Sequence, residues 1–532
     1  MHLTPSTAWA WLIACAVVIL LFPLAAQFGN LKGKLSSFRT WVWAIALLGI
    51  VTAGFMPFIF DPGITHFEVQ PFIFFITGTL LGVLFLGEFH RLSTRNKQEN
   101  THRVHAERRT RYSKAVEQLA YPNPAVRASA ISTLAGLVDE WLADEQLSVE
   151  ARQKEGQVVV NALCAYVRSP FARAFKAEAF ESDTPPANYA GDFATDLAAF
   201  RGEQDVRRSV FVEMSKRSST LTENEKGEVA VVPGAWSGFE FDFSRAVVFY
   251  PLDGLTIENA DFSAARFCNG SDFSGAAFVG DANFTRAVFD QDARFSDVTF
   301  MGAADFSNTR FAGDAFFRWV AFSSNADFRE ASFRGRADFR DTTFVADAGF
   351  SGASFEGNAG FFRSSFGGNA SFFRTDFAGV AEFREAVFEG HAGFNAATFY
   401  GDAHFSRATF EGLAGFRDVT FKAGAEFYGA SFVQTADFCD SSFVKSPPLF
   451  VVEDADSGEM RRARFAALPT GSEAAGQTAH NFAVYEGSQP IPLGTVGLNG
   501  VGYRIPVGTV LFDPNSWDER QKEYTRLSEP AQ

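Results

Sequence analysis

The sequence predicts a multi-domain protein with three transmembrane helices, then a small all-α region, then an all-β solenoid that fills most of the C-terminal half. Three patterns support this prediction: long apolar stretches near the N-terminus, apolar residues at helical spacing in the middle, and columns in which every eleventh residue is Phe. At 532 residues the chain is too long for one ordinary domain. It holds 63 Phe against 8 Trp and 10 Tyr, so one aromatic type fills one structural position many times.

The apolar stretches lie at residues 8–26, 40–60 and 71–87, and none contains an ionised side chain. A transmembrane helix needs about 20 apolar residues, so we expect a membrane anchor over residues 1–90. Lys and Arg are absent before the first stretch and between the second and third, but they occur between the first and second and are frequent in a basic juxtamembrane segment at 91–114. By the positive-inside rule this predicts a multi-pass cell-membrane protein, with the lipid bilayer as a partner, its N-terminus outside and the repeat domain in the cytoplasm.

Apolar residues at helical spacing predict a helical adaptor over residues 115–219. Val126, Ala130, Leu134 and Leu137 share one stripe of a helix, and Pro-containing corners separate this helix from its neighbours. Short antiparallel helices of this kind resemble a HEAT-like pair stack. A linker rich in charge, Gly and Ser is expected at 220–240.

The repeat region contains two Phe columns whose register never slips. The residue two before the first column is Ala in 16 of 17 copies, and the residue two before the second column is always small. The first column comprises Phe262, Phe273, Phe284, Phe295, Phe306, Phe317, Phe328, Phe339, Phe350, Phe361, Phe372, Phe383, Phe394, Phe405, Phe416, Phe427 and Phe438. The second column lies five positions later, from Phe267 to Phe443.

This spacing excludes a helix, because the two columns would point about 140° apart at about 100° per residue. In an extended segment, residues two apart share a face, so the small residue and its Phe both point inward. Gly stands four positions before the first-column Phe in ten copies. We expect a corner or bulge with positive φ at these glycines.

At these residues the chain resembles the pentapeptide-repeat family, in the variant A-x-F-x-x-A-x-F-x-G-x. The resemblance covers residues 241–445 and implies a right-handed quadrilateral β-helix. The sixth residue that is added to every second five-residue unit predicts about 22 residues per coil instead of the usual five-by-four. More loosely, the complete chain resembles membrane-anchored, multi-span actinobacterial members of this family. Residues 446–532 follow as a C-terminal cap and small β region, with a polar terminal helix expected at 513–527.

No residue pattern in the chain indicates catalysis, and the chain is predicted not to be an enzyme. The four cysteines are widely separated and form no zinc or disulfide spacing. No cofactor, metal site or small-molecule substrate is expected, and the formal net charge of −15 disfavours nucleic acid as a partner. The Asp residues before many first-column Phe, among them Asp305, Asp327 and Asp338, are expected to face outward and to serve solubility.

The leading functional prediction is a membrane-tethered intracellular scaffold that presents the solenoid to an unidentified protein. Two alternatives remain open: a DNA mimic that regulates a DNA-binding enzyme such as gyrase, and a membrane sensor whose spans carry the function. Arg and aromatic residues are enriched at interface centres, and between 318 and 417 they replace small polar residues after the first-column Phe. Scattered surface residues would also fit this pattern. The predicted partner-binding residues are Arg318, Trp319, Arg340, Phe362 and Arg384.

Overall fold

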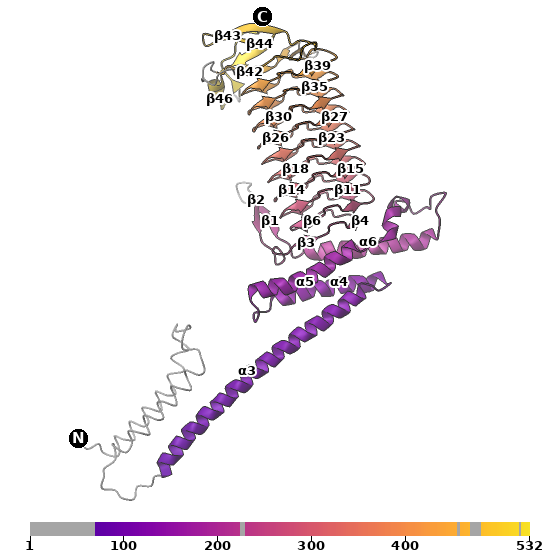
Figure 1. Ribbon diagram of the computed structural model, residues 1–532, viewed down its shortest axis with the longest axis vertical. Helices are drawn as coiled ribbons and strands as arrows, with labels where there is room; N and C mark the ends of the chain where they lie inside the picture. Colours follow the sequence, from indigo (N-terminus) through magenta and orange to yellow (C-terminus); the bar gives the residue numbers. More distant parts are fainter. Residues whose placement is uncertain (1–69, 224–228, 455–457, 469–479, 521–522) are drawn as a thin grey trace, which may run out of the picture. The chain divides into compact units, whose positions relative to one another are not determined.

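The computed structural model describes residues 70–223, 229–454, 458–468, 480–520 and 523–532. The chain divides into two units, residues 1–111 and 112–532. The helices are α3 (Gln70–Gln118), α4 (Pro124–Leu142), α5 (Val149–Arg168) and α6 (Phe193–Ser215), with a 3-10 helix η1 (Ala172–Phe180). The solenoid follows them in the second unit (Figure 1).

The prediction of three transmembrane helices is corrected by the structure. Within the described ranges, no helix has an apolar stretch long enough to cross a bilayer. The third predicted span, 71–87, lies in α3, where the apolar stretch falls short of the about 20 residues required and Glu88 follows at once. The other two spans, 8–26 and 40–60, lie outside the described residues. The predicted fold class is therefore wrong in its membrane part, and the multi-pass localisation that was derived from it is wrong as well.

The helical region of the second unit is built on capped helices. Asn123 accepts a hydrogen bond from the Ala125 N–H and precedes Pro124, so α4 begins directly after the Pro-containing turn. Ser148 caps α5 and Asp192 caps α6 in the same way. The segment expected as a linker at 220–240 contains a hairpin of β1 (Thr220–Glu223) and β2 (Val229–Val232).

Helix α6 covers the first coil of the solenoid. The Phe211 ring lies 4.6 Å from the Phe243 ring and is stacked on Phe262 at 6.3 Å, measured between ring centroids. Val210 and Met214 of the same helix are buried beside it. A solenoid end exposes apolar rings and unpaired backbone groups, so this amphipathic helix serves as the N-terminal cap.

Each coil contributes one two-residue strand to each of four parallel sheets, which we number in chain order. Sheet I contains β3 (Phe241–Asp242), β6 (Ala260–Asp261), β10 (Ala282–Asn283), β14 (Ala304–Asp305), β18 (Ala326–Asp327), β22 (Ala348–Gly349), β26 (Ala370–Ser371), β30 (Ala392–Gly393), β34 (Ala414–Gly415) and β38 (Ala436–Asp437). Sheet II contains β4 (Val247–Val248), β7 (Arg266–Phe267), β11 (Val288–Phe289), β15 (Arg310–Phe311), β19 (Ser332–Phe333), β23 (Ser354–Phe355), β27 (Asp376–Phe377), β31 (Thr398–Phe399), β35 (Thr420–Phe421) and β39 (Ser442–Phe443).

The other two sheets complete the four-sided coil. Sheet III contains β8 (Ser271–Asp272), β12 (Ala293–Arg294), β16 (Ala315–Phe316), β20 (Ala337–Asp338), β24 (Ala359–Gly360), β28 (Ala381–Glu382), β32 (Ala403–His404) and β36 (Ala425–Glu426). Sheet IV contains β5 (Thr256–Ile257), β9 (Ala277–Phe278), β13 (Thr299–Phe300), β17 (Ala321–Phe322), β21 (Thr343–Phe344), β25 (Ser365–Phe366), β29 (Val387–Phe388), β33 (Thr409–Phe410), β37 (Ser431–Phe432), β42 (Arg464–Ala466) and β45 (Val510–Phe512).

Strand register confirms the predicted coil length of about 22 residues. Ala282 pairs with Ala304 and Ala304 with Ala326, and the Phe-column strands of the other three sheets keep the same interval, whereas the first coil is shorter, with Phe241 paired to Ala260. About nine such coils make up the solenoid. Two sequence repeats therefore form one coil, because one first-column Phe lies on sheet I and the next on sheet III.

The core is a continuous stack of Phe rings. The Phe350 ring lies 4.9 Å from both Phe328 and Phe372 in its own column, with interplanar angles of 1° and 3°. It also meets Phe339 and Phe361 of the opposite sheet edge-on, at 5.5 and 5.4 Å. The predicted inward direction of both columns is confirmed, since these rings are almost completely buried.

The repeated glycines do not have the predicted backbone conformation. Positive φ occurs two positions after each first-column Phe, at values of 53 to 72°, and most of these residues are not glycine. A Cβ on Gly379 would instead lie 2.5 Å from the Gly357 carbonyl oxygen of the preceding coil. Glycine is therefore favoured where successive coils approach most closely, and Ser324, Ala346 and Ala423 occupy the same position in other coils. At the turn, cross-coil hydrogen bonds such as Asn308 N–H to the Arg329 carbonyl at 2.8 Å hold the left-handed residues in place.

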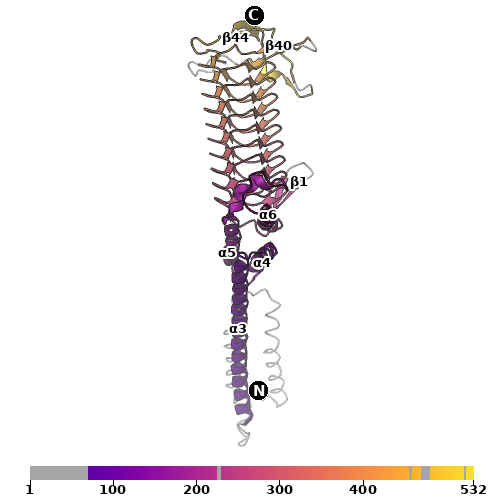
Figure 2. The ribbon, with the colours of Figure 1, turned by 90° about the vertical axis from the view of Figure 1, so that its right-hand side faces the viewer.

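The C-terminal segment closes the last coil. Phe450, Phe465 and Phe482 stack on Phe427, Phe432 and Phe438 at 5.3, 4.9 and 6.0 Å. Two hairpins flank them, formed by β40 (Val451–Glu453) with β41 (Met460–Arg462) and by β43 (Leu493–Leu498) with β44 (Val501–Pro506), at the solenoid end in Figure 2. The helix predicted at 513–527 is wrong. That segment contains the 3-10 helix η2 (Pro514–Ser516) and the strands β46 (Trp517–Asp518) and β47 (Glu523–Tyr524).

Two adjacent phenylalanines test the column assignment. Phe372 is fully buried, whereas Phe373 is 42% exposed. Phe372→Ala should lower the free energy of unfolding by about 3–5 kcal/mol, because it removes one ring from the stack and leaves a cavity. Phe373→Ala should cost no more than about 1 kcal/mol. Equal losses in chemical denaturation would contradict the inward assignment.

A pair of glycines tests the close approach of the coils. Gly379→Ala places a methyl group against the Gly357 backbone and should destabilise the fold by about 1–3 kcal/mol. At Gly393 the nearest atom to an added Cβ is 3.9 Å away, so Gly393→Ala should change stability by less than about 0.5 kcal/mol. Thermal and chemical unfolding of the two variants would distinguish them, and an unaffected Gly379 variant would exclude the steric explanation.

Candidate functional site

The predicted partner-binding residues lie together on one side of the solenoid. Four of them directly follow a buried Phe of sheet III in four consecutive coils, and Trp319 lies beside Arg318 in the turn. The buried rings beneath them are 4.7–4.9 Å apart. Two further residues of this side, Arg336 and Asp338, were not among the predicted ones. We call this surface the arginine flank and define it by Arg318, Trp319, Arg336, Asp338, Arg340, Phe362 and Arg384.

Asp338 holds three guanidinium groups of the flank. Its Oδ2 accepts from Arg318 Nε at 2.5 Å and forms an ion pair with Arg336 Nη2 at 3.0 Å. Its Oδ1 accepts from Arg340 Nε at 2.8 Å. The Asp338 side chain is completely buried, while the three arginine side chains are 30–42% exposed. One hidden carboxylate therefore orders three exposed cations.

The electrostatics of this cluster favour an ionised Asp338. Burial raises the pKa of the carboxyl, but hydrogen bonds from Arg340 and Arg318 outweigh it, so the pKa lies below its ordinary value. Three guanidinium charges against one carboxylate leave two positive charges in the cluster. Two further acids lie next to the cluster: Asp314 Oδ1 accepts from the Arg336 N–H at 2.8 Å, and the charge of Asp341 acts on Arg340.

Aromatic side chains surround the arginines. Trp319 is 57% exposed and has a left-handed φ of 55°. The Arg318 guanidinium lies 5.5 Å from the centre of the Phe316 ring. Two coils further on, Phe362 is half-buried, and the Arg363 guanidinium lies 4.8 Å from its ring centre. Cation–π contacts of this kind fix the arginine side chains further.

Arg384 lies on the same flank but in a separate ion pair. It binds Glu382, two positions before it in the sequence, and makes no contact with Asp338 in the described structure. The structure therefore brings Arg318 and Arg340 into one cluster with Trp319 beside it, and it leaves Phe362 and Arg384 as neighbours in the next two coils.

The role of Asp338 was missed from the sequence, because all Asp residues that stand directly before a first-column Phe were assigned to solubility. Most of them have a local role instead: Asp305 and Asp327 each accept from the N–H of the residue after the Phe, at 2.8 and 2.9 Å. Asp338 alone among the aspartates before a first-column Phe is fully buried. The sequence does contain a signal for this cluster: the arginines at positions 318, 336 and 340 all lie within one coil length of Asp338.

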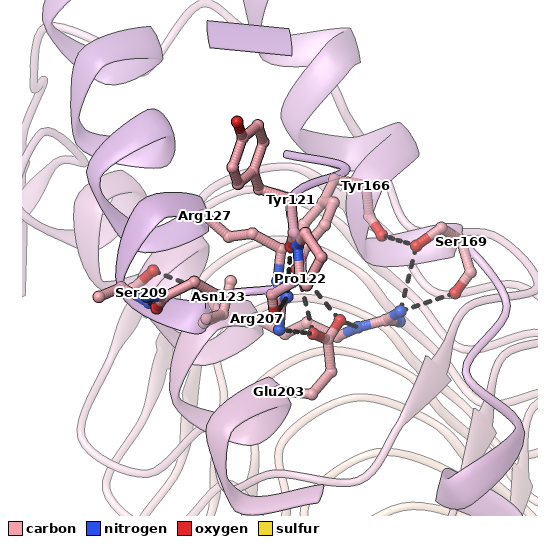
Figure 3. Close-up of polar contacts among 11 residues, drawn as sticks. Tyr121, Pro122, Asn123, Arg127, Tyr166, Ser169, Glu203, Arg207 and Ser209 are labelled. Carbon is pink, nitrogen blue, oxygen red and sulfur yellow. Dashed lines mark hydrogen bonds and ion pairs between the residues drawn. The ribbon is translucent and has the colours of Figure 1, made fainter. Parts of the chain in front are cut away.

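A second polar cluster lies in the helical region. Glu203 of α6 accepts from Arg127 Nη2 of α4 at 2.9 Å, from Arg207 Nε at 2.7 Å and from the Tyr166 hydroxyl of α5 at 3.1 Å (Figure 3). Burial is the main cause that raises the pKa of Tyr166 to about 12, and the negative charge of Glu203 is the second. The hydroxyl therefore keeps its proton and donates a hydrogen bond to Glu203. Arg207 is buried and donates to the Val167 carbonyl at 2.7 Å. The cluster joins α4, α5 and α6.

The described part of the chain offers no arrangement for metal chemistry. It contains no group of three or more His, Cys, Asp and Glu side chains that could hold a metal ion. The arginine side chains of the flank are hydrogen-bond donors and cations that Asp338 holds in place.

Comparison with known families identifies the repeats. The family model of pentapeptide repeats (9 copies) matches residues 280–318, 295–343 and 372–420, all within the Phe columns. No curated protein and no solved structure matches the chain. The repeat region is thus a pentapeptide-repeat β-solenoid, a fold that is typically non-catalytic and that is consistent with a protein-interaction module. The resemblance to membrane-anchored actinobacterial members is not supported.

Removing the central acid tests the cluster. Asp338→Asn should lower the free energy of unfolding by about 2–3 kcal/mol near neutral pH, since it leaves three guanidinium groups without their shared counter-ion and partial exposure screens only some of the repulsion. Asp347→Asn is the matched control, because this exposed corner position already holds Asn in the neighbouring coils, at Asn325 and Asn369. It should be nearly neutral.

The pH dependence of that loss has a definite sign. Because the Asp338 pKa is lowered in the folded chain, the carboxylate stabilises the fold above its ordinary value of 3.8, and this stabilisation is lost as the pH falls through the folded pKa. The difference between wild type and Asp338→Asn in denaturant titrations should therefore shrink below about pH 4. A difference that grows in acid would contradict an ionised Asp338.

Proposed function

We propose that this protein is a protein-interaction module whose arginine flank binds an acidic surface of a partner protein. The observation that carries the proposal is the buried Asp338, which holds Arg318, Arg336 and Arg340 while their side chains stay 30–42% exposed. Ordering long side chains usually costs free energy on binding. Here folding has already fixed them, so that cost is reduced before a partner arrives.

The composition of the flank supports the same proposal. Arg and Trp are the residue types most often found at energetic centres of interfaces, and Trp319 is exposed beside Arg318. Three ordered guanidinium groups on one side favour a partner surface that carries carboxylates. The stacked Phe core beneath it is rigid, which keeps the flank in one geometry.

The solenoid would act as a scaffold in this proposal. It presents the arginine flank to one partner, and its other faces remain available for different contacts. DNA mimicry is not advanced, because its only support is the acidic net charge of the chain.

Partner capture with flank variants tests the proposal. Immobilised full-length protein with Arg318→Gln and Arg340→Gln should recover the partner about tenfold less efficiently than wild type, because both substitutions remove charge-assisted hydrogen bonds. The matched control is Arg310→Gln with Arg334→Gln, which removes two charges from the sheet II side of coils near the cluster. Circular dichroism and thermal unfolding would establish that both double variants are folded.

The same capture experiment should also show that recovery depends on electrostatic attraction to an acidic partner. Recovery should fall as salt rises above about 0.15 M, and polyglutamate should compete where polylysine does not. Equal recovery by both double variants would exclude the arginine flank, and insensitivity to polyglutamate would exclude an acidic partner.

A further inference from the structure

A pocket of about 600 Å³ lies in the helical region beside the Glu203 cluster. Its walls come from the turn after α3, the end of α5 and the middle of α6. The volume is within the range typical of small-molecule sites. Phe171, Pro124, Pro170 and Ala199 supply apolar walls, and Arg127 supplies the charged side.

The charges around this pocket do not balance. Arg127 and Arg207 share the single carboxylate of Glu203, and no other acid pairs with either of them in the described structure. Arg173, which also lines the pocket, is neutralised by Asp196 at 2.7 Å. One positive charge is therefore left over among largely buried groups. An unbalanced buried charge is costly, and a bound anion removes that cost.

The hydrogen bonds show which atom could receive the anion. Arg207 and Glu203 are committed to partners through their nitrogen and oxygen atoms. Arg127 donates through Nη1 to the Tyr121 and Pro122 carbonyls and through Nη2 to Glu203. Its Nε is buried and has no acceptor among the described residues. Such a donor is rare in a folded protein and calls for an explanation.

We propose that this pocket binds a small organic anion with an apolar body, whose carboxylate or phosphate oxygen accepts from Arg127 Nε. The oxyanion supplies the missing negative charge, and the apolar body lies against Phe171 and the two prolines. The site connects to the solenoid, because the Phe171 ring is stacked on Phe249 at 5.2 Å and Phe249 also meets Phe200 of α6 at 5.1 Å. Occupation would stabilise the joint between the helices and the first coil. This proposal is independent of the arginine flank.

Calorimetric titration of the full-length protein with benzoate and with inorganic phosphate tests the site. Benzoate offers a carboxylate with an apolar body, and phosphate offers the oxyanion alone. Benzoate should bind with millimolar affinity or better and raise the unfolding temperature, as a ligand of the folded state must. Binding of phosphate alone, or of neither probe, would overturn the proposed ligand class.

Variants decide whether the probe occupies this pocket. Ala198 is exposed at its wall, so Ala198→Phe fills the pocket and leaves every hydrogen bond of the Glu203 cluster in place. This variant should bind benzoate at least tenfold more weakly, and Arg127→Lys, which keeps the charge but removes Nε, should do the same. Arg201→Met is the control, because Arg201 lies on the same helix, is paired with Asp183 and does not line the pocket. Wild-type affinity in the Ala198 variant, or equal weakening in the Arg201 variant, would overturn the assignment.

Discussion

The parallel stacking of phenylalanine rings from one coil to the next determines most of this structure. Rings in one column repeat about every 4.8 Å, which is the spacing of hydrogen-bonded strands, so side-chain and backbone ladders share one repeat. The edge-on contacts between sheets I and III fill the space that Ala leaves beside each ring. This geometry fixes how closely the coils approach, and the close approach in turn favours glycine at one corner, where ten copies have it.

The same stacking makes the surface predictable. Every residue lies directly above its counterpart in the preceding coil, so side chains far apart in the sequence form short vertical strips. The arginine flank is one such strip, in which the acid and its three arginines come from adjacent coils. The corner position three before the first-column Phe forms another: Asp347 Oδ1 accepts from the Asn369 N–H at 2.8 Å, and Asn369 Oδ1 accepts from the His391 N–H at 3.1 Å. These polar ladders satisfy backbone groups that no strand would otherwise pair.

Sequence reasoning predicted the solenoid well because one side-chain type carries its periodicity. The inward columns follow from the Phe spacing, and the coil of two repeats follows from that spacing together with the fold implied by the resemblance to pentapeptide repeats. It failed where one residue type has two physical uses. Glycine permits positive φ but also close approach, and here the second use applies while Arg, Asp and Trp319 occupy the left-handed turn. The membrane prediction failed for a related reason: residues 71–87 are apolar, which suggests a transmembrane helix, but the stretch is too short to cross a bilayer. Asp338 could be placed on a side of the coil, but its burial depends on Arg318 of the preceding coil and on the arginines at either side of it, which no single repeat reveals.

One coil contains two sequence repeats, and this ratio limits how the chain can change in length. Loss of a single repeat would keep both Phe columns intact and preserve the core, yet every residue beyond the deletion would move to the opposite side of the coil. Strips that depend on vertical neighbours, such as Asp338 with Arg318, would be separated. Duplication or loss of two repeats would shift the end of the solenoid by one coil and leave each side aligned. The core thus tolerates changes of one repeat, whereas the surface tolerates only pairs, and a lineage that conserves a binding side should vary in steps of one whole coil.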